Sequence, residues 1–191
     1  MEPRILIGTD EGLWELGQAG SVAVEALAGQ PVAALAAAGA RTWALVGERA
    51  IWSTDDGRRW EPAASVEGQP ATCLASTPAG LLVGTEQAHL LRLAGSRLEP
   101  VEAFDTAEGR DAWYTPWGDP ADVRSISVEP GGGAIYVNVH VGGVVRSRDG
   151  GRSWTPTLDI EADVHQVLAH PARPGVVLAA AAIGLGVSHD G

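Results

Sequence analysis

The chain has 191 residues, a net charge of −11 and 45% hydrophobic residues. This length and hydrophobic content suit one globular domain with a sizeable core, and they exclude wholesale disorder. The excess of acidic side chains repels phosphate backbones, so nucleic acid is not an expected partner.

Three further features bear on where the protein works. Cys73 is the only cysteine, which excludes an internal disulfide and is typical of a reducing compartment. The first residues lack the basic and apolar segments of a signal peptide. The most apolar stretch, residues 176–187, is interrupted by Gly184 and Gly186 and is too short to span a bilayer. We therefore expect a cytoplasmic protein with no membrane partner.

Short runs of β-prone residues recur along the chain, separated by glycine and proline. In chain order they include residues 5–9, 41–46, 80–85, 134–141 and 175–182. Runs of this length, bounded by turn residues, predict strands. The alanine-rich segment 31–40 has helical propensity, but it stands where the repeat requires a strand. We let the periodicity decide and predict a strand there too.

Aligned with one another, the runs form a four-strand unit that repeats about every 40–50 residues, which is typical of a β-propeller blade. The predicted fold is all-β, with about four and a half antiparallel four-stranded blades of a ring of roughly six to eight. We read the chain as the N-terminal portion of such a ring, whose open blade edges would self-associate if it existed alone. The expected units are a partial first blade lacking its innermost strand (1–29), three full blades (30–66, 67–104 and 122–160), a truncated last blade (161–191) and one long loop (105–122).

One motif occurs twice in full and once in part. Residues 53–60 read STDDGRRW, residues 147–154 read SRDGGRSW, and residues 188–191 read SHDG. The pattern S-x-D-x-G-x-[ST]-W resembles the Asp-box, or bacterial neuraminidase repeat, of YVTN-type and sialidase-like bacterial β-propellers. That resemblance implies a hairpin between the third and fourth strands of a blade, on the bottom rim of the propeller.

The residues of the motif have a direct structural use. A short aspartate can accept hydrogen bonds from turn N–H groups, a glycine can adopt positive φ, and a tryptophan can bury a large area over the turn. We therefore predict a structural role and no catalysis for these residues: Ser53, Asp55, Gly57, Trp60, Ser147, Asp149, Gly151 and Trp154.

The opposite, top face is the predicted location of function. Its longest connection, 105–122, carries Trp113, Tyr114 and Trp117, and a loop of this length is usually functional or mobile. Exposed aromatic rings with acidic neighbours suit a sugar or another small molecule with a polar face. The alternative is that the loop plugs the channel or packs between blades.

Five more residues are expected on the same face: Asp122, Arg124, His140, Asp163 and His165. The ligand-binding set is then the three aromatic residues with Asp122, Arg124 and the two histidines. His140, His165 and Asp163 could act as general acid and base or bind a divalent metal, although their spacing matches no known metal motif. The alternative is that they position a ligand.

A sialidase is the activity that the resemblance first suggests. It requires three arginines around a carboxylate and a tyrosine paired with a glutamate, and no glutamate is evidently placed beside Tyr136. We therefore do not predict sialidase activity. The leading hypothesis is a non-catalytic ligand-binding or scaffold propeller without a cofactor. The alternatives are a hydrolase of the glycan or lactone class, and a protein–protein interaction module.

Overall fold

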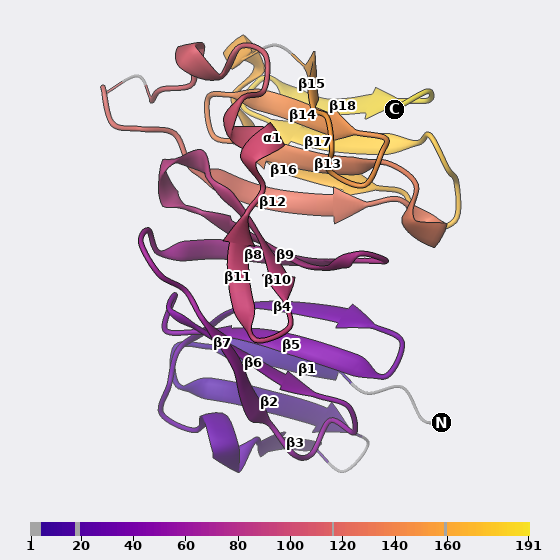
Figure 1. The fold of residues 1–191 in the computed structure, drawn as a ribbon. Helices are drawn as coiled ribbons and strands as arrows, with labels where there is room; N and C mark the ends of the chain where they lie inside the picture. The colour runs from indigo at the N-terminus through magenta and orange to yellow at the C-terminus, as the bar shows by residue number, and fades with distance from the viewer. Residues whose placement is uncertain (1–4, 18–19, 116, 159) are drawn as a thin grey trace.

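The computed structural model describes residues 5–17, 20–115, 117–158 and 160–191 (Figure 1). Residues 1–4 and 18–19 of the expected first blade, residue 116 of the long loop and residue 159 of the fourth blade lie outside the described residues. In the part of the chain that is described, no helix is long and apolar enough to cross a membrane.

The described strands form five antiparallel sheets in chain order. The first sheet consists of β1 (Ile5–Thr9), β2 (Gly12–Gly17) and β3 (Gly20–Ala23). The second consists of β4 (Val32–Ala38), β5 (Arg41–Val46), β6 (Ala50–Thr54) and β7 (Glu61–Ser65). The third consists of β8 (Ala71–Thr77), β9 (Gly80–Thr85), β10 (Leu90–Ala94) and β11 (Arg97–Pro100).

The remaining two sheets have the same order of strands. The fourth consists of β12 (Val123–Val128), β13 (Ile135–Val139), β14 (Gly143–Ser147) and β15 (Thr155–Leu158). The fifth consists of β16 (Val164–Ala169), β17 (Val177–Ala181) and β18 (Gly184–Ser188). Short helices join them: α1 (Glu102–Asp105) and five 3-10 turns, η1 (Glu25–Leu27), η2 (Glu86–Ala88), η3 (Arg110–Ala112), η4 (Pro130–Gly132) and η5 (Ile160–Ala162).

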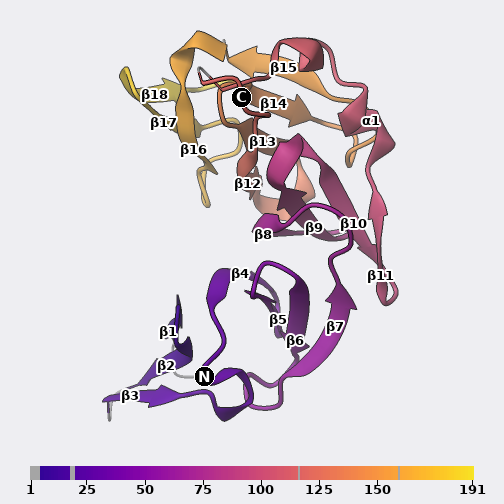
Figure 2. The ribbon, with the colours of Figure 1, turned by 90° about the vertical axis from the view of Figure 1, so that its left-hand side faces the viewer.

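The sheets succeed one another along an arc, and β4, β8, β12 and β16 run side by side on its inner side (Figure 2). Each sheet of this kind is a propeller blade, so the predicted all-β propeller is confirmed. The alanine-rich segment 32–38 is the strand β4, as the repeat predicted. Small side chains suit this position because the innermost strands crowd around the axis.

The first sheet contains the second, third and fourth strands of a blade. A Cβ added to Gly8 in β1 would lie 3.0 Å from the Val32 Cγ1 of β4, and a Cβ on Gly84 in β9 would collide with Val123 of β12 in the same way. Gly84 lies in the second strand of its sheet. Gly8 and Gly84 therefore pack in the same way against the innermost strand of the following sheet. Because Gly84 lies in the second strand of its blade, β1 occupies the position of a second strand as well.

The two faces of the arc carry different connections. The top face holds the turns between second and third strands, such as residues 140–142, together with the links from one sheet to the next. The bottom face holds the turns between third and fourth strands, such as 55–60 and 148–154. In Figure 1 the top face lies on the left-hand side, and the long link 105–122 forms its upper part.

The core lies between neighbouring sheets rather than within one of them. Between the third and fourth sheets, Leu82, Phe104, Val137 and Trp154 belong to one buried cluster. Phe104 follows β11 on helix α1, although residues 96–104 form one β-prone run that stands where the repeat requires a fourth strand. The strand ends at Pro100 because the helix after it turns Phe104 into this cluster, where its side chain is fully buried.

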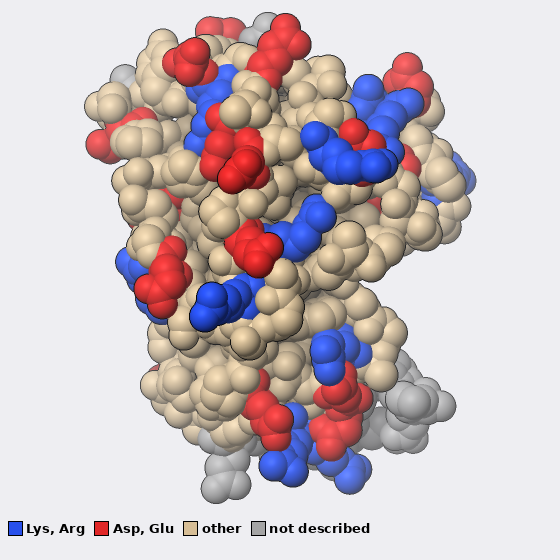
Figure 3. Space-filling view, viewed as in Figure 1, with Lys and Arg blue, Asp and Glu red and all other residues tan. Residues whose placement is uncertain are grey.

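Charge is distributed evenly over the surface that Figure 3 displays. Acidic and basic side chains lie interspersed among larger uncharged areas, so the excess negative charge is not gathered into one patch on this side. This side therefore offers no extended region of a single sign to steer a charged macromolecule.

Candidate functional site

The bottom-face turn between β14 and β15 is organised by Asp149. Its Oδ1 accepts hydrogen bonds from the N–H groups of Arg152 and Ser153, both at 2.9 Å. The Ser147 hydroxyl donates to Oδ1 at 2.8 Å, and the Ser153 hydroxyl donates to Oδ2 at 2.6 Å. These donors stabilise the carboxylate and hold the pKa of Asp149 well below its ordinary value.

The turn between β6 and β7 uses different residues from those that the motif alignment assigned. Asp56, not Asp55, accepts the N–H groups of Arg58 and Arg59, at 2.7 and 2.8 Å. Thr54, not Ser53, donates its hydroxyl to that carboxylate at 3.0 Å. The assignment of Ser53 and Asp55 is therefore corrected by one residue, because this turn is one residue shorter than its counterpart.

Asp55 points away from the turn and binds Arg41 on β5. The Arg41 guanidinium donates two hydrogen bonds to the carboxylate, at 2.6 and 2.7 Å, and both side chains are more than half exposed. An exposed ion pair of this kind contributes little to stability. The two adjacent aspartates therefore differ in role: Asp56 holds the turn, and Asp55 lies on the surface.

We expect Asp56→Ala to lower the melting temperature several times more than Asp55→Ala does. The first change removes the acceptor of two backbone N–H groups, whereas the second removes an exposed ion pair. Thermal unfolding followed by circular dichroism measures both variants. Equal melting temperatures would contradict the corrected register.

We expect stability to fall as the pH drops from about 4 to about 2. The pKa of Asp56 is lowered to about 2, first by the backbone hydrogen bonds from Arg59 and Arg58, and that of Asp149 is lowered further. A carboxyl group whose folded pKa is depressed contributes stability above its unfolded pKa, near 3.9 for aspartate, and loses it as the pH falls through the folded pKa. Urea unfolding of Asp149→Asn should show a flatter pH dependence over this range than the parent protein. An unchanged slope would contradict this role.

The partial third copy begins the same turn. The Ser188 hydroxyl donates to Asp190 Oδ1 at 3.0 Å and accepts the N–H of Gly191 at 3.1 Å. Thr54 makes the corresponding bonds to Asp56 and Gly57. Residues 188–191 therefore have the local geometry of the turn after β6.

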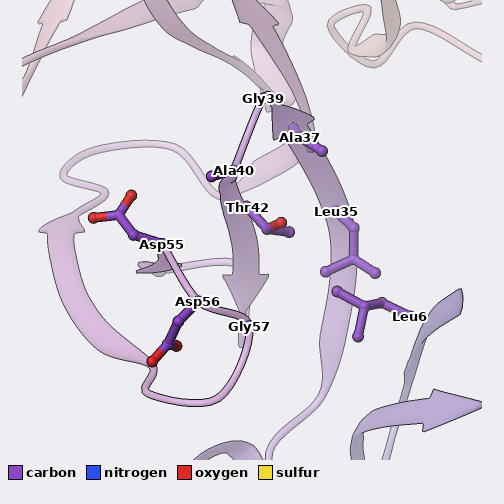
Figure 4. A pocket seen from close by; sticks show the side chains of 10 residues that line it. Leu6, Leu35, Ala37, Gly39, Ala40, Thr42, Asp55, Asp56 and Gly57 are labelled. Atoms are coloured by element: carbon purple, nitrogen blue, oxygen red, sulfur yellow. The ribbon is translucent and has the colours of Figure 1, made fainter. Parts of the chain in front are cut away.

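A cavity of about 610 Å³ adjoins the first of these turns on the bottom face. Leu6 and Leu35 form one wall of it, and Asp55 and Asp56 stand at its opposite rim (Figure 4). The carboxylate of Asp56 is already used by the turn. We assign this cavity no ligand, because the carboxylate of Asp56 holds the turn and that of Asp55 is paired with Arg41.

On the top face, the long link 105–122 is anchored by contacts at its start. Arg110 donates to the Ala88 carbonyl at 2.6 Å, and its guanidinium stacks over the Trp113 ring at 5.2 Å. His89 Nδ1 lies 2.9 Å from Asp105 Oδ1. The indole of Trp113 meets Phe104 at 5.5 Å between ring centroids. Trp113, which we predicted as a ligand contact, therefore packs between blades, as the alternative reading of the loop required.

The rest of the link forms a small closed loop. Tyr114 pairs with Pro120, and the Thr115 N–H and hydroxyl both donate to the Asp119 carbonyl at 2.9 Å. This loop holds Trp117 at its tip, where the side chain is 66% exposed. Tyr114 is also exposed, at 58%. The link 105–122 thus carries one inward aromatic residue, Trp113, and two exposed ones, Tyr114 and Trp117.

Trp117 stands beside the predicted histidines. Its ring centroid is 5.7 Å from that of His140, and the His140 ring is 6.4 Å from that of His165. His140 Nε2 lies 3.5 Å from Asp163 Oδ1, and the side chain of His140 is only 6% exposed. We call these four residues, Trp117, His140, Asp163 and His165, the top-face patch.

Asp122 and Arg124 flank the patch in different ways. The main-chain carbonyl of Asp122 accepts the N–H of His140 at 2.8 Å, and the side-chain Oδ1 of Asp122 accepts the N–H of Gln87 at 3.0 Å. Asp122 therefore fixes the turn that carries His140. Arg124 is exposed on β12 close enough to contribute to the electrostatics of His140.

The electrostatic environment favours the neutral form of His140. Burial lowers the pKa of His140 from its ordinary value of 6.5, and the positive charge of Arg124 lowers it further, while Asp163 acts in the opposite direction. Asp163 itself adopts φ 46°, the left-handed region that a residue with a Cβ rarely occupies. A neutral imidazole beside a carboxylate can accept a proton or a hydrogen bond from a ligand.

The divalent metal suggested by the sequence stays a prediction. Among the described residues, no group of three or more histidine, cysteine, aspartate or glutamate side chains is arranged to hold a metal ion. Cys73 offers no nucleophile either, because burial raises the pKa of its thiol to about 11.

One pair was missed by the sequence reasoning. The hydroxyl of Tyr136 donates to Glu129 Oε1 at 3.1 Å, which corrects the expectation that no glutamate accompanies this tyrosine. The hairpin register of β12 and β13, which pairs Val128 with Ile135, brings Glu129 back beside Tyr136. Tyr136 is 1% exposed and Glu129 also accepts the N–H groups of Ala134 and Gly175. The pair therefore holds two blades together on the bottom face.

Comparisons with known proteins show the fold and nothing finer. No family model and no curated protein matches the chain. The extracellular domain of the hybrid two-component system protein BT4673 from B. thetaiotaomicron is similar, with a TM-score of 0.74, 14% identity, 98% of this chain covered and 25% of that chain. An ancestral GH74 enzyme has a TM-score of 0.65 and 14% identity over 94% of this chain and 28% of its own. YCF48 bound to D1 peptide has a TM-score of 0.58 and 12% identity over 98% and 65%.

The chain is a β-propeller protein by its sheets and by these likenesses. It spans between a quarter and about two thirds of the length of the three structures. At 12–14% identity they carry no residue of a site across to it.

Proposed function

We propose that this protein is a cytoplasmic, non-catalytic binding propeller whose top-face patch holds a glycan or another small ligand with a polar face. The observation that supports this most is Trp117, a large ring that is 66% exposed and stands over a buried histidine. An exposed indole is costly to leave in water, and an apolar face with nearby polar groups is what a sugar ring binds.

The roles follow from the geometry of the patch. Trp117 would stack on the ligand, and Tyr114 at the other end of the loop would extend the contact. The neutral ring of His140 would accept or donate a hydrogen bond, depending on its tautomer. His165 and Arg124, both exposed, would contact polar groups at the rim. Asp122 would position His140 through the backbone.

We expect Trp117→Ala to weaken ligand binding by about tenfold to a hundredfold without lowering the melting temperature, because the ring is exposed in the free protein. A glycan array identifies the ligand, and calorimetry compares the two proteins. Leu168→Ala, which removes an exposed apolar side chain of β16, is the matched control and should bind as the parent does. Undiminished binding by Trp117→Ala would contradict this proposal.

A hydrolase acting on a glycan or a lactone is the second candidate. It is favoured by the 3.5 Å separation of His140 and Asp163, which suits a general base and the carboxylate that orients it. Release of product from the bound ligand, lost in both His140→Gln and Asp163→Asn, would establish it. Binding without turnover supports the non-catalytic propeller.

An interaction module is the third candidate, and one structural neighbour, YCF48, is seen with a bound peptide. A top face that binds a partner protein through Trp117, and no small ligand, would favour this candidate. Co-purification with the parent protein and with Trp117→Ala distinguishes it from the other two.

A further inference from the structure

Asn138 is a fully buried polar residue that the blade fold does not require. It lies on β13, the second strand of the fourth sheet, and it follows the register shift between the first two strands. The residues at the same place in the second, third and fifth sheets are Leu45, Gly84 and Ala180. None of these three has a polar side chain. Because a buried amide costs free energy that an apolar residue does not, Asn138 must serve something other than the blade itself.

The amide group of Asn138 lacks hydrogen-bond partners. Neither its Oδ1 nor its Nδ2 bonds to any part of the chain that the structure describes. This amide has two N–H donors and a carbonyl acceptor to satisfy. Buried side-chain polar groups in native proteins are nearly always paired with protein atoms or with ordered water. The partner of this amide is therefore expected to come from outside the chain.

The repeat shows where the side chain of Asn138 is directed. A Cβ on Gly84, its equivalent in the third sheet, would meet Val123 at the start of the next innermost strand, β12. Val164 holds the place of Val123 in the fifth sheet, because each opens its innermost strand just before the register shift. Asn138 is therefore directed from the fourth sheet toward the start of β16, where Val164 lies between Asp163 and His165 of the top-face patch.

A second unpaired oxygen lies at the start of β16. The Oδ1 atom of Asp163 is buried and accepts no hydrogen bond from the described residues, and the 3.5 Å to His140 Nε2 is too long for one. The backbone there is also unusual, since Asp163 adopts φ 46°. The residues at the same place in the second and third sheets are Pro31 and Pro70, whose rings exclude positive φ. Backbone strain of this kind is typical of functional sites.

The side chains of Asn138 and His140 are spaced for one bridging oxygen atom. The two residues are two positions apart on an extended strand, so their side chains share a face and their Cα atoms lie about 7 Å apart. A water molecule that bonds to two polar groups spans about 5.5–6 Å between them. The His140 side chain is only 6% exposed, so it would screen such a water molecule from the solvent.

We infer that Asn138, His140 and Asp163 form an internal water-binding site between the fourth and fifth sheets, and that the bound water fixes the orientation of the His140 ring. A water molecule both donates and accepts, so it can satisfy the Asn138 amide and Asp163 Oδ1 together. Asn138 is thereby a positioning residue for the histidine of the top-face patch. The site belongs to the free protein and does not depend on the function proposed for the patch.

The direct test observes the water at the Asn138 side chain. Asn138 is the only asparagine of the chain, so labelling asparagine with ¹⁵N gives a single side-chain N–H₂ signal. NOESY and ROESY spectra recorded in H₂O detect transfer from a bound water to these protons and to the ring protons of His140. We expect cross peaks to water at both side chains. If the Asn138 N–H₂ protons show no water cross peak, the inference is overturned.

Asn138→Leu removes the site by introducing the residue that the second sheet has at this place. We expect it to abolish the water cross peak at the His140 ring and to move the titration of His140, followed by ring ¹³C and ¹⁵N shifts, to lower pH. The loss of hydration disfavours the charged imidazolium, whose pKa burial already lowers. The charged groups around the ring stay in place: Arg124, Asp163, His165 and Asp122. An unchanged titration of His140 in this variant would overturn the inference.

Two further variants keep this test decisive. Leu168→Ala changes an exposed side chain of the same strand as His165 and should leave the titration of His140 unchanged. Asn138→Ser keeps a hydroxyl that can bond to water, and it covers the case in which the leucine variant does not fold. The serine variant should retain the water cross peak at His140 and titrate close to the parent protein. Loss of that cross peak in the serine variant would contradict a site for water.

Discussion

Replacing Trp154 with alanine is expected to lower the free energy of unfolding by about 3–5 kcal/mol. The indole is 6% exposed and meets the Phe104 ring edge-on, with centroids 5.2 Å apart. Its loss leaves a cavity between the third and fourth sheets that the rigid strands on either side cannot close. Urea unfolding followed by intrinsic fluorescence and circular dichroism measures the effect.

The matched control for this prediction is Trp117→Ala, which removes the same side chain from an exposed position. It should change the free energy of unfolding by less than about 0.5 kcal/mol, as exposed substitutions generally do. A Trp154→Ala protein as stable as this control would show that the bottom-face tryptophans do not hold the blades together.

The second large effect is expected from Gly84→Ala, which should cost about 1–3 kcal/mol by overpacking. A Cβ at this position would lie 2.7 Å from Cys73 Sγ and would collide with Val123, which is fully buried on the innermost strand of the next blade. The third and fourth sheets approach so closely here that only a glycine fits between them.

A double-mutant cycle tests the cause of that loss. Val123→Ala removes the methyl groups that the new Cβ would strike, so the double variant should be more stable than the sum of the single effects predicts. We expect a coupling energy of roughly 0.5–3 kcal/mol. Strict additivity would mean that the cost of Gly84→Ala arises elsewhere.

The fold was predictable because the same strand pattern repeats along the chain. Each blade repeats short β-prone runs at one period, and the period overrode the helical propensity of residues 32–38, which form β4. The end of the third blade was less predictable. Phe104 is an apolar residue in a run that reads as a strand, so the sequence does not show that the strand ends before it. In the structure, helix α1 carries Phe104 into the cluster between the third and fourth sheets.

The bottom-face turns show where a motif is too coarse. Ser53 and Thr54 are both hydroxyl residues, and Asp55 and Asp56 are both aspartates, so the pattern can be aligned in two ways. The hydrogen bonds of Asp56 to two backbone N–H groups decide between them. The amino-acid sequence alone does not distinguish the aspartate that holds the turn from the one that pairs with Arg41.

The top-face patch was predictable in its members but not in their orientation. Strand order alone indicated that the turn of His140 and the link before β16 share one face with the long loop. Trp113 and Trp117 are four residues apart in that loop, yet one packs against Phe104 and the other is exposed. The closed loop formed by Thr115 and Asp119 separates them, and no periodicity reveals such a loop.

The most direct test of the binding face is a map of amide chemical shifts on ¹⁵N-labelled protein, recorded while the ligand found on the glycan array is added. Our account predicts that the largest changes fall at residues 114–119, 140–142 and 163–165, on the top face, and that the ligand remains chemically intact. Changes confined to the bottom-face turns at 54–60 and 147–154, or conversion of the ligand to a product, would contradict it.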